Sequence, residues 1–127
     1  HDLAPVSEDF VVLRFDSSLV FINAAYFEQA VLKALSEFPK ASALLVVGNG
    51  INRIDATGEE KLRALTQDLK AAGVTLMFAG LKKPVRSALE RAGLDDVIGP
   101  KNIFPTKHIA LQVLERQYSK ERPPGAA

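Results

Sequence analysis

The residues best placed for chemistry lie in segment 51–58, which reads INRIDATG. It follows an apolar run and precedes a helical pattern, so we expect Asp55 and Thr57 beside the free N–H groups of a helix N-terminus. Such a terminus attracts anions and phosphoryl groups through its dipole and its unpaired donors. In the competing interpretation, Asp55 and Thr57 bond to those amides themselves. The candidate anion- or partner-binding loop comprises Asn52, Arg53, Asp55, Ala56, Thr57 and Gly58.

A second candidate surface is basic. Residues 1–63 carry 6 basic and 9 acidic side chains, whereas residues 64–127 carry 10 basic and 6 acidic ones. Part of this excess gathers at Lys82, Lys83 and Arg86. These cations are either a solvated helix face or a docking surface for an acidic partner or anionic lipid.

The composition excludes several functional classes. The absence of cysteine rules out disulfides, cysteine-liganded zinc, iron–sulfur clusters and a thiol nucleophile. Two histidines are too few for a histidine-rich metal centre, and a net charge of +1 is too small to indicate nucleic-acid binding. The sequence contains neither GxxxxGK[ST] nor GxGxxG and suggests no nucleophile–base pair. We therefore predict no catalytic residue, no metal, no cofactor and no nucleic-acid partner.

The elements that position these residues begin with a predicted hairpin. β-branched and aromatic residues fill segments 10–15 and 19–22, and a polar turn separates them. We expect the Asn23 side chain to cap the helix that follows and Pro39 to stop that helix. The continuous apolar run 43–47 predicts a strand that is covered on both faces.

The second half of the chain predicts helices alternating with strands. Thr57 and Glu60 have the spacing of a capping box, so Thr57 is expected to cap the helix after the loop. A buried strand is expected over 74–79, and Val97 and Ile98 are expected to form a brief last strand. The final helix is expected to turn five residues inward: Ile109, Ala110, Val113, Leu114 and Gln117.

The resulting order, β-β-α-β-α-β-α-β-α, predicts one α/β domain. Its central sheet is expected to be mixed and mostly parallel, with about five strands, an antiparallel edge formed by the N-terminal hairpin, and four flanking helices. Residues 9–119 would form this domain, after a leader or linker over 1–8 and before a flexible tail over 120–127. In such sheets binding sites lie at the carboxyl ends of the strands, where the loop 48–58 is expected.

The order of elements and the segment IDATG, residues 54–58, resemble a STAS domain over nearly all of residues 9–119. STAS domains occur in anti-sigma-factor antagonists and in SulP-type anion transporters. In the antagonists the segment is similar to Asp-Ser-x-Gly, and a partner kinase phosphorylates the serine. Ala56 stands at that position, so the resemblance implies no serine switch here, and Thr57 keeps a hydroxyl one residue later.

Two further stretches resemble the transporter branch. RF at 14–15 with LVFINA at 19–24 is similar to its signature before the first helix. IFPT at 103–106, with His108 and Ala110, is similar to the segment that opens its last helix. The acidic residue that often ends the preceding central strand in the family is replaced by Val47, which argues against a polar role there.

The resemblance implies a non-catalytic regulatory or interaction domain on the cytoplasmic side of the membrane. It would support the assembly, targeting or activity of a transporter for sulfate, bicarbonate or another anion. The implied partners are the membrane part of its own transporter, through which two copies would pair, and a nucleotide or cytosolic protein. A nucleotide would bind at loop 48–58, with Arg53 or Lys61 as phosphate partners.

Two alternatives stay open at this point. The first is a free-standing anti-sigma-factor antagonist that acts by partner switching, against which Ala56 argues. The second is a small enzyme on a flavodoxin-like sheet, against which the lack of a nucleophile–base pair argues.

Overall fold

The computed structural model describes residues 9–121 of the chain. The predicted leader, residues 1–8, lies outside the described residues, as do residues 122–127 of the predicted tail. Residues 120 and 121, which were assigned to that tail, continue the last helix. Within the described range no helix combines the length and apolarity that crossing a membrane requires.

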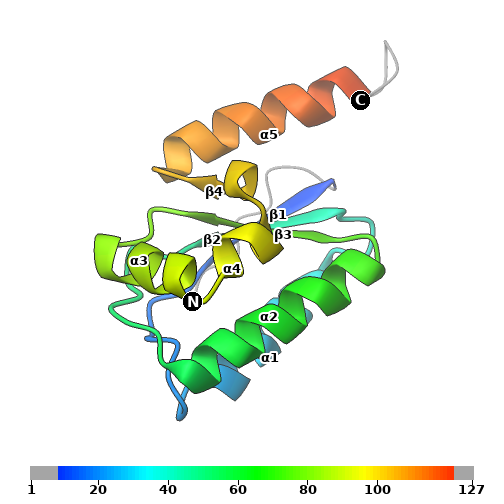
Figure 1. Cartoon of the computed structure of the whole chain (residues 1–127). Helices are drawn as coiled ribbons and strands as arrows, with labels where there is room; N and C mark the ends of the chain where they lie inside the picture. Colours follow the sequence, from blue (N-terminus) through cyan, green and yellow to red (C-terminus); the bar gives the residue numbers. More distant parts are fainter. Residues whose placement is uncertain (1–8, 122–127) are drawn as a thin grey trace.

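A parallel sheet of four strands forms the centre of the fold (Figure 1). Its strands lie side by side in chain order: β1 (Phe10–Arg14), β2 (Ala43–Val47), β3 (Thr75–Ala79) and β4 (Ile103–Phe104). β2 is buried along its whole length, which explains why its sequence is a continuous apolar run. The predicted α/β class with a mostly parallel sheet is confirmed.

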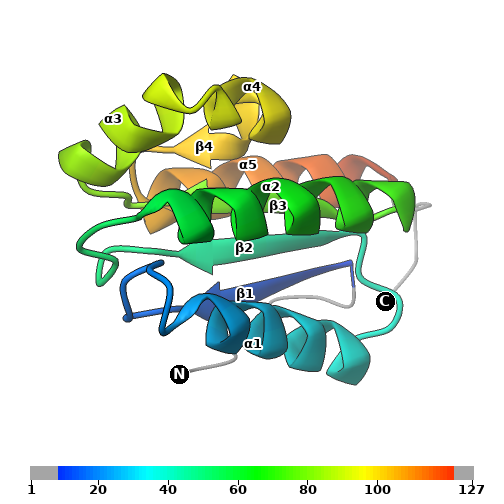
Figure 2. The same ribbon diagram turned by 60° about the horizontal axis from the view of Figure 1, so that its bottom comes forward.

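Helices cover both faces of the sheet, as Figures 1 and 2 show. One face carries α1 (Ala24–Glu37), α2 (Ala56–Ala71), α3 (Lys83–Arg91) and α4 (Leu94–Ile98). The other face carries α5 (Lys107–Glu121). Alternate strand residues therefore enter two separate cores, because successive side chains of a strand point to opposite faces.

The predicted hairpin is absent from the described residues. β1 pairs with β2 in parallel, and segment 19–22 contributes only a single parallel bridge between Leu19 and Ile54. The chain then turns, with the amides of Asn23 and Ala24 both bonded to the Val20 carbonyl. The apolar run predicts a strand, but its last two residues, Phe21 and Ile22, are exposed to solvent and do not pair with a strand. The sheet accordingly has no antiparallel edge within the described range, and four strands instead of five.

Several helix details also differ from expectation. Asn23 holds the N-cap position of α1, but its side chain makes no capping hydrogen bond. Val97 and Ile98 belong to the short helix α4, and the last strand is β4. That extra helix makes five instead of four among residues 9–121.

The last helix buries a narrower stripe than predicted. Ala110, Leu114 and Tyr118 are buried at i, i+4 spacing, whereas Ile109 and Val113 are 41% and 44% exposed. A helix alone on one face of a sheet buries only the residues that point straight at that sheet. The Tyr118 ring stacks on Phe10 with 5.5 Å between ring centroids.

Candidate functional site

The predicted loop lies at the carboxyl ends of the strands, between β2 and α2, as Figure 2 shows. Two backbone hydrogen bonds tie it to the segment after β1. The Leu19 amide donates to the Arg53 carbonyl at 3.0 Å, and the Asp55 amide donates to the Leu19 carbonyl at 3.1 Å. Ile51 is fully buried and anchors the loop in the core. The two loops therefore form one surface.

Asp55 is the residue that caps α2. Its carboxylate accepts hydrogen bonds from the Gly58 amide at 2.9 Å and from the Phe21 amide at 3.0 Å. The hydrogen bond from Gly58, followed by that from Phe21, lowers the pKa of Asp55 below its ordinary value. The carboxylate is consequently charged at neutral pH and joins the two loops.

The predicted capping box at Thr57 is wrong. Helix α2 begins at Ala56, so Thr57 is already inside the first turn, and its side chain is exposed. An ionised carboxylate accepts a stronger hydrogen bond from a backbone amide than a hydroxyl does, which explains why Asp55 takes the capping position.

Gly58 is required by the close approach of the two loops. A Cβ atom at this position would lie 1.8 Å from the Leu19 carbonyl oxygen. No side chain fits in that space, so the glycine allows the first turn of α2 to pack against segment 19–21. Asp55 and Gly58 thus both hold the two loops together: Asp55 accepts amide hydrogen bonds from both, and Gly58 leaves room for the Leu19 carbonyl.

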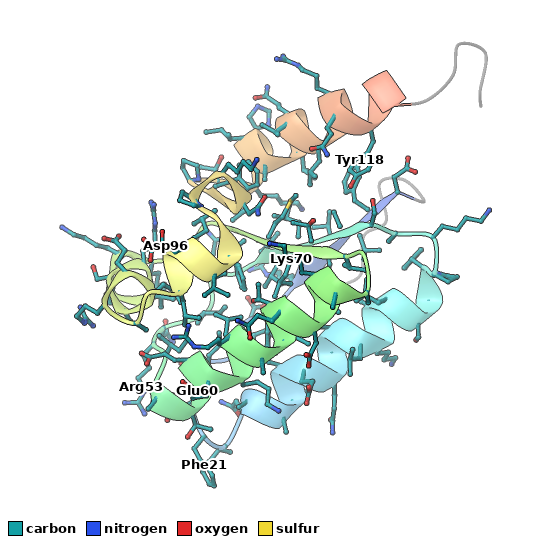
Figure 3. All side chains as sticks on the ribbon, turned by 45° about the vertical axis from the view of Figure 1, so that its right-hand side comes forward. Phe21, Arg53, Glu60, Lys70, Asp96 and Tyr118 are labelled. Carbon is teal, nitrogen blue, oxygen red and sulfur yellow. The ribbon has the colours of Figure 1, made fainter. Side chains whose placement is uncertain are left out.

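Part of this exposed surface is apolar. Phe21 and Ile22 are 74% and 83% exposed, and Ala56 and Thr57 on the first turn of α2 are exposed as well. The hydrogen bond from the Phe21 amide to Asp55 joins the two segments. Figure 3 shows Phe21 extending from one end of the molecule, with Arg53 and Glu60 near the start of α2. Phe21 and Ile22 were missed as surface residues because their apolar types favour a strand. No pattern in the sequence distinguishes such an exposed turn from a buried one.

The basic cluster adjoins the loop. Lys82, the N-cap residue of α3, donates through its Nζ to the Asn52 side-chain oxygen. Lys83 and Arg86 are exposed in the first turn of the same helix. The structure therefore brings the two predicted surfaces together, although 30 residues separate Asn52 from Lys82 in the chain.

The two cations predicted to hold a phosphate have different surroundings. Lys61 pairs with Glu28 across α1 and α2, with 3.0 Å between Nζ and Oε1. Arg53 is exposed and forms no ion pair with the residues described. The Asp55 carboxylate already bonds to the α2 amide that a phosphate would use. Among residues 9–121 there is also no group of three His, Asp or Glu side chains that could hold a metal ion.

We define the tie surface as Phe21, Ile22, Asn52, Arg53, Ala56, Thr57 and the three cations Lys82, Lys83 and Arg86. It combines exposed apolar side chains with positive charge on one edge of the sheet. Asp55 is left out of this definition, because its carboxylate bonds to the Gly58 and Phe21 amides inside the contact between the loops. Chemically, this arrangement suits contact with another macromolecule better than turnover of a small substrate.

The chain matches the STAS domain family model over residues 3–110. It is 32% identical over 108 residues to a protein named "Probable sulfate transporter" from Mycobacterium tuberculosis, and the match covers 84% of this chain. The same match covers only 19% of that protein, so the chain spans about a fifth of this relative.

Solved structures agree on the fold. The STAS domain of a SulP transporter from Vibrio cholerae superimposes with a TM-score of 0.76 at 21% identity, over 91% of this chain and 88% of that one. The unphosphorylated anti-sigma factor antagonist SpoIIAA gives a TM-score of 0.67 at 16% identity, over 90% and 95%. The resemblance found in the sequence is confirmed: the chain belongs to the STAS domain family, beside the STAS domains of SulP-type sulfate transporters.

Proposed function

We propose that the chain is the non-catalytic regulatory domain of a SulP-type anion transporter, located on the cytoplasmic side of the membrane. The sulfate-transporter relative and the SulP structural neighbour support this assignment. In this proposal the domain acts by contact, and the membrane part of its own transporter is its partner. Two copies of the domain would then be brought together by pairing of the transporter.

The observation that carries the proposal is the internal use of Asp55. Its carboxylate bonds to Gly58 and Phe21, and thereby fixes an exposed apolar turn next to exposed cations. A phosphate or nucleotide at the same helix terminus would face a charged carboxylate, whereas an apolar protein surface would cover Phe21 and Ile22. The geometry therefore favours a protein contact over nucleotide binding at this loop.

Partner switching by phosphorylation is less well supported. Ala56, the first residue of α2, has no hydroxyl, although its neighbour Thr57 is exposed. A phosphate on Thr57 would add negative charge beside Asp55, and like charges at this spacing repel. We therefore propose a constitutive contact and not a phosphorylation switch at this loop.

The test uses the full-length protein that contains this chain, expressed in cells that lack their own sulfate uptake. We expect the double variant Phe21→Asp, Ile22→Asp to take up less labelled sulfate, or to be present in the membrane in a smaller amount, than the wild-type protein. Leu32→Asp is the matched control, because Leu32 is an exposed apolar residue on α1 outside the tie surface. Uptake and membrane amounts equal to wild type in the double variant would contradict the proposed contact.

A calorimetric titration of the isolated chain tests the nucleotide alternative. We expect neither GTP nor ATP to give saturable heat. If binding is saturable and the Arg53→Ala variant loses it, the loop is a nucleotide-binding site instead.

A further inference from the structure

A pocket opens near the amino end of β3, at the opposite end of the sheet from the tie surface. It encloses about 230 Å³ and lies between the C-terminal half of α2, the start of β3, α4 and the 3₁₀ turn Pro100–Asn102. A water molecule takes a share of about 30 Å³ in the liquid, so the pocket has room for a small organic molecule. We propose that it binds a small organic anion with an apolar body, such as an aliphatic carboxylate.

The body of such a ligand would contact an apolar wall. Leu76 and Ile98 are buried, and Val74 and Val97 are half-buried, and all four line the pocket. They come from two different parts of the fold that meet here. An alkyl chain placed against them removes apolar surface from water on both sides, which favours binding.

The charge of the ligand would be held by two lysines. Lys70 and Lys101 line the pocket, no acidic residue lines it, and neither lysine forms an ion pair with any residue in the described range. Figure 3 shows Lys70 extending from α2 on the side of that helix that faces the sheet and α4. Two lysines in the lining of one pocket, with no acidic residue in that lining, are complementary to an anion.

The other polar side chains that line the pocket are uncharged, so none of them would repel an anion. The Thr66 hydroxyl donates to the Leu62 carbonyl, and the Asn102 amide donates to the Ile98 carbonyl. Thr75, the first residue of β3, also lines the pocket, and its hydroxyl has no hydrogen-bond partner among the described residues. That hydroxyl is therefore available to donate to a bound carboxylate.

The helix dipole explains only one of the two lysines. Lys70 lies in the last turn of α2, where a cation stabilises the helix terminus. Lys101 comes from the separate 3₁₀ turn, so the dipole of α2 gives no reason for its presence. The presence of Lys101 beside Lys70 in the lining of the same pocket remains as evidence for an anion.

The test is a titration of the ¹⁵N-labelled chain, followed through amide chemical shifts, at constant ionic strength. Hexanoate supplies both tail and charge, hexanol the tail alone, and sulfate the charge alone. We expect saturable shifts with hexanoate at residues 70–76 and 97–102, and at least about fivefold weaker binding of hexanol and of sulfate.

Lysine variants test whether Lys70 and Lys101 bind the carboxylate of the ligand. We expect Lys70→Ala and Lys101→Ala each to weaken hexanoate binding about threefold to fivefold, the range that one exposed charge pair provides. Lys33→Ala on α1 is the control and should leave binding unchanged. Both pocket lysines are exposed, so the variants should fold, and their unliganded spectra show whether they do. The proposal is overturned if hexanol or sulfate binds as tightly as hexanoate, or if the lysine variants bind like wild type. It does not depend on the transporter assignment.

Discussion

Replacing Gly58 by alanine tests whether the contact between the two loops is as tight as the structure shows. The added Cβ would lie 1.8 Å from the Leu19 carbonyl oxygen and 2.7 Å from its carbonyl carbon. Both atoms belong to the backbone, so no side-chain rotation relieves the contact. Either the first turn of α2 or segment 19–21 must move.

Two effects of opposite sign decide the outcome. Gly58 is the third residue of α2, and alanine is favoured over glycine in a helix by about 1 kcal/mol. Overpacking of a well-packed site costs about 1–3 kcal/mol, and a contact with a fixed backbone belongs at the upper end of that range. We therefore expect Gly58→Ala to lower the free energy of unfolding by about 1–2 kcal/mol.

Urea unfolding monitored by circular dichroism measures this difference. Ala64→Gly is the control, because Ala64 is exposed on the same helix and its change reports helix propensity alone. We expect that control to lose about 1 kcal/mol. A Gly58→Ala variant as stable as wild type, or more stable, would show that propensity prevails and that the loops are not in tight contact.

Two further predictions concern other contacts. Because hydrogen bonds lower the pKa of Asp55 below 3.8, its carboxylate contributes stability above that pH and loses it as the pH falls through the folded-state value. The stability difference between wild type and Asp55→Asn in urea should accordingly shrink below pH 3.8, and a difference constant down to pH 2 would argue against the capping role. Tyr118→Phe removes the 2.9 Å hydrogen bond to Ser42 and should cost about 0.5–1.5 kcal/mol, whereas Tyr118→Ala also empties the core under α5 and should cost about 3 kcal/mol or more. If thermal unfolding showed the same loss of stability in both variants, the packing of the Tyr118 ring would add nothing beyond its hydrogen bond, which would contradict this prediction.

The parts of the fold that could be predicted from the sequence are those in which one physical signal dominates. The apolar run 43–47 has to be buried on both faces, and a strand between two helix layers satisfies this requirement. Segment 19–22 carries the same signal but is a turn, because Leu19 finds its backbone partners in the loop after β2 and not in β1. Such a choice depends on contacts between distant residues, which local composition does not encode.

The candidate site shows the same limit. Its position at the start of α2 was predictable, because sites in parallel sheets lie where the strands end. The capping residue was not, since both Asp55 and Thr57 are good caps by type and only the geometry of the turn selects between them. The hydrogen bond between Lys82 and Asn52 likewise depends on how α3 follows β3, which no spacing in the sequence reveals.

The motif IDATG can be divided by what each residue does in the structure. Asp55 and Gly58 hold the two loops together, one by accepting two amide hydrogen bonds and the other by leaving room for a carbonyl. Ala56 and Thr57 lie between them, and both side chains are exposed on the first turn of α2. Because Ala56 has no hydroxyl, the two loops of this chain are held together without one at position 56. This chain therefore has the STAS fold that it shares with SpoIIAA although position 56 has no hydroxyl.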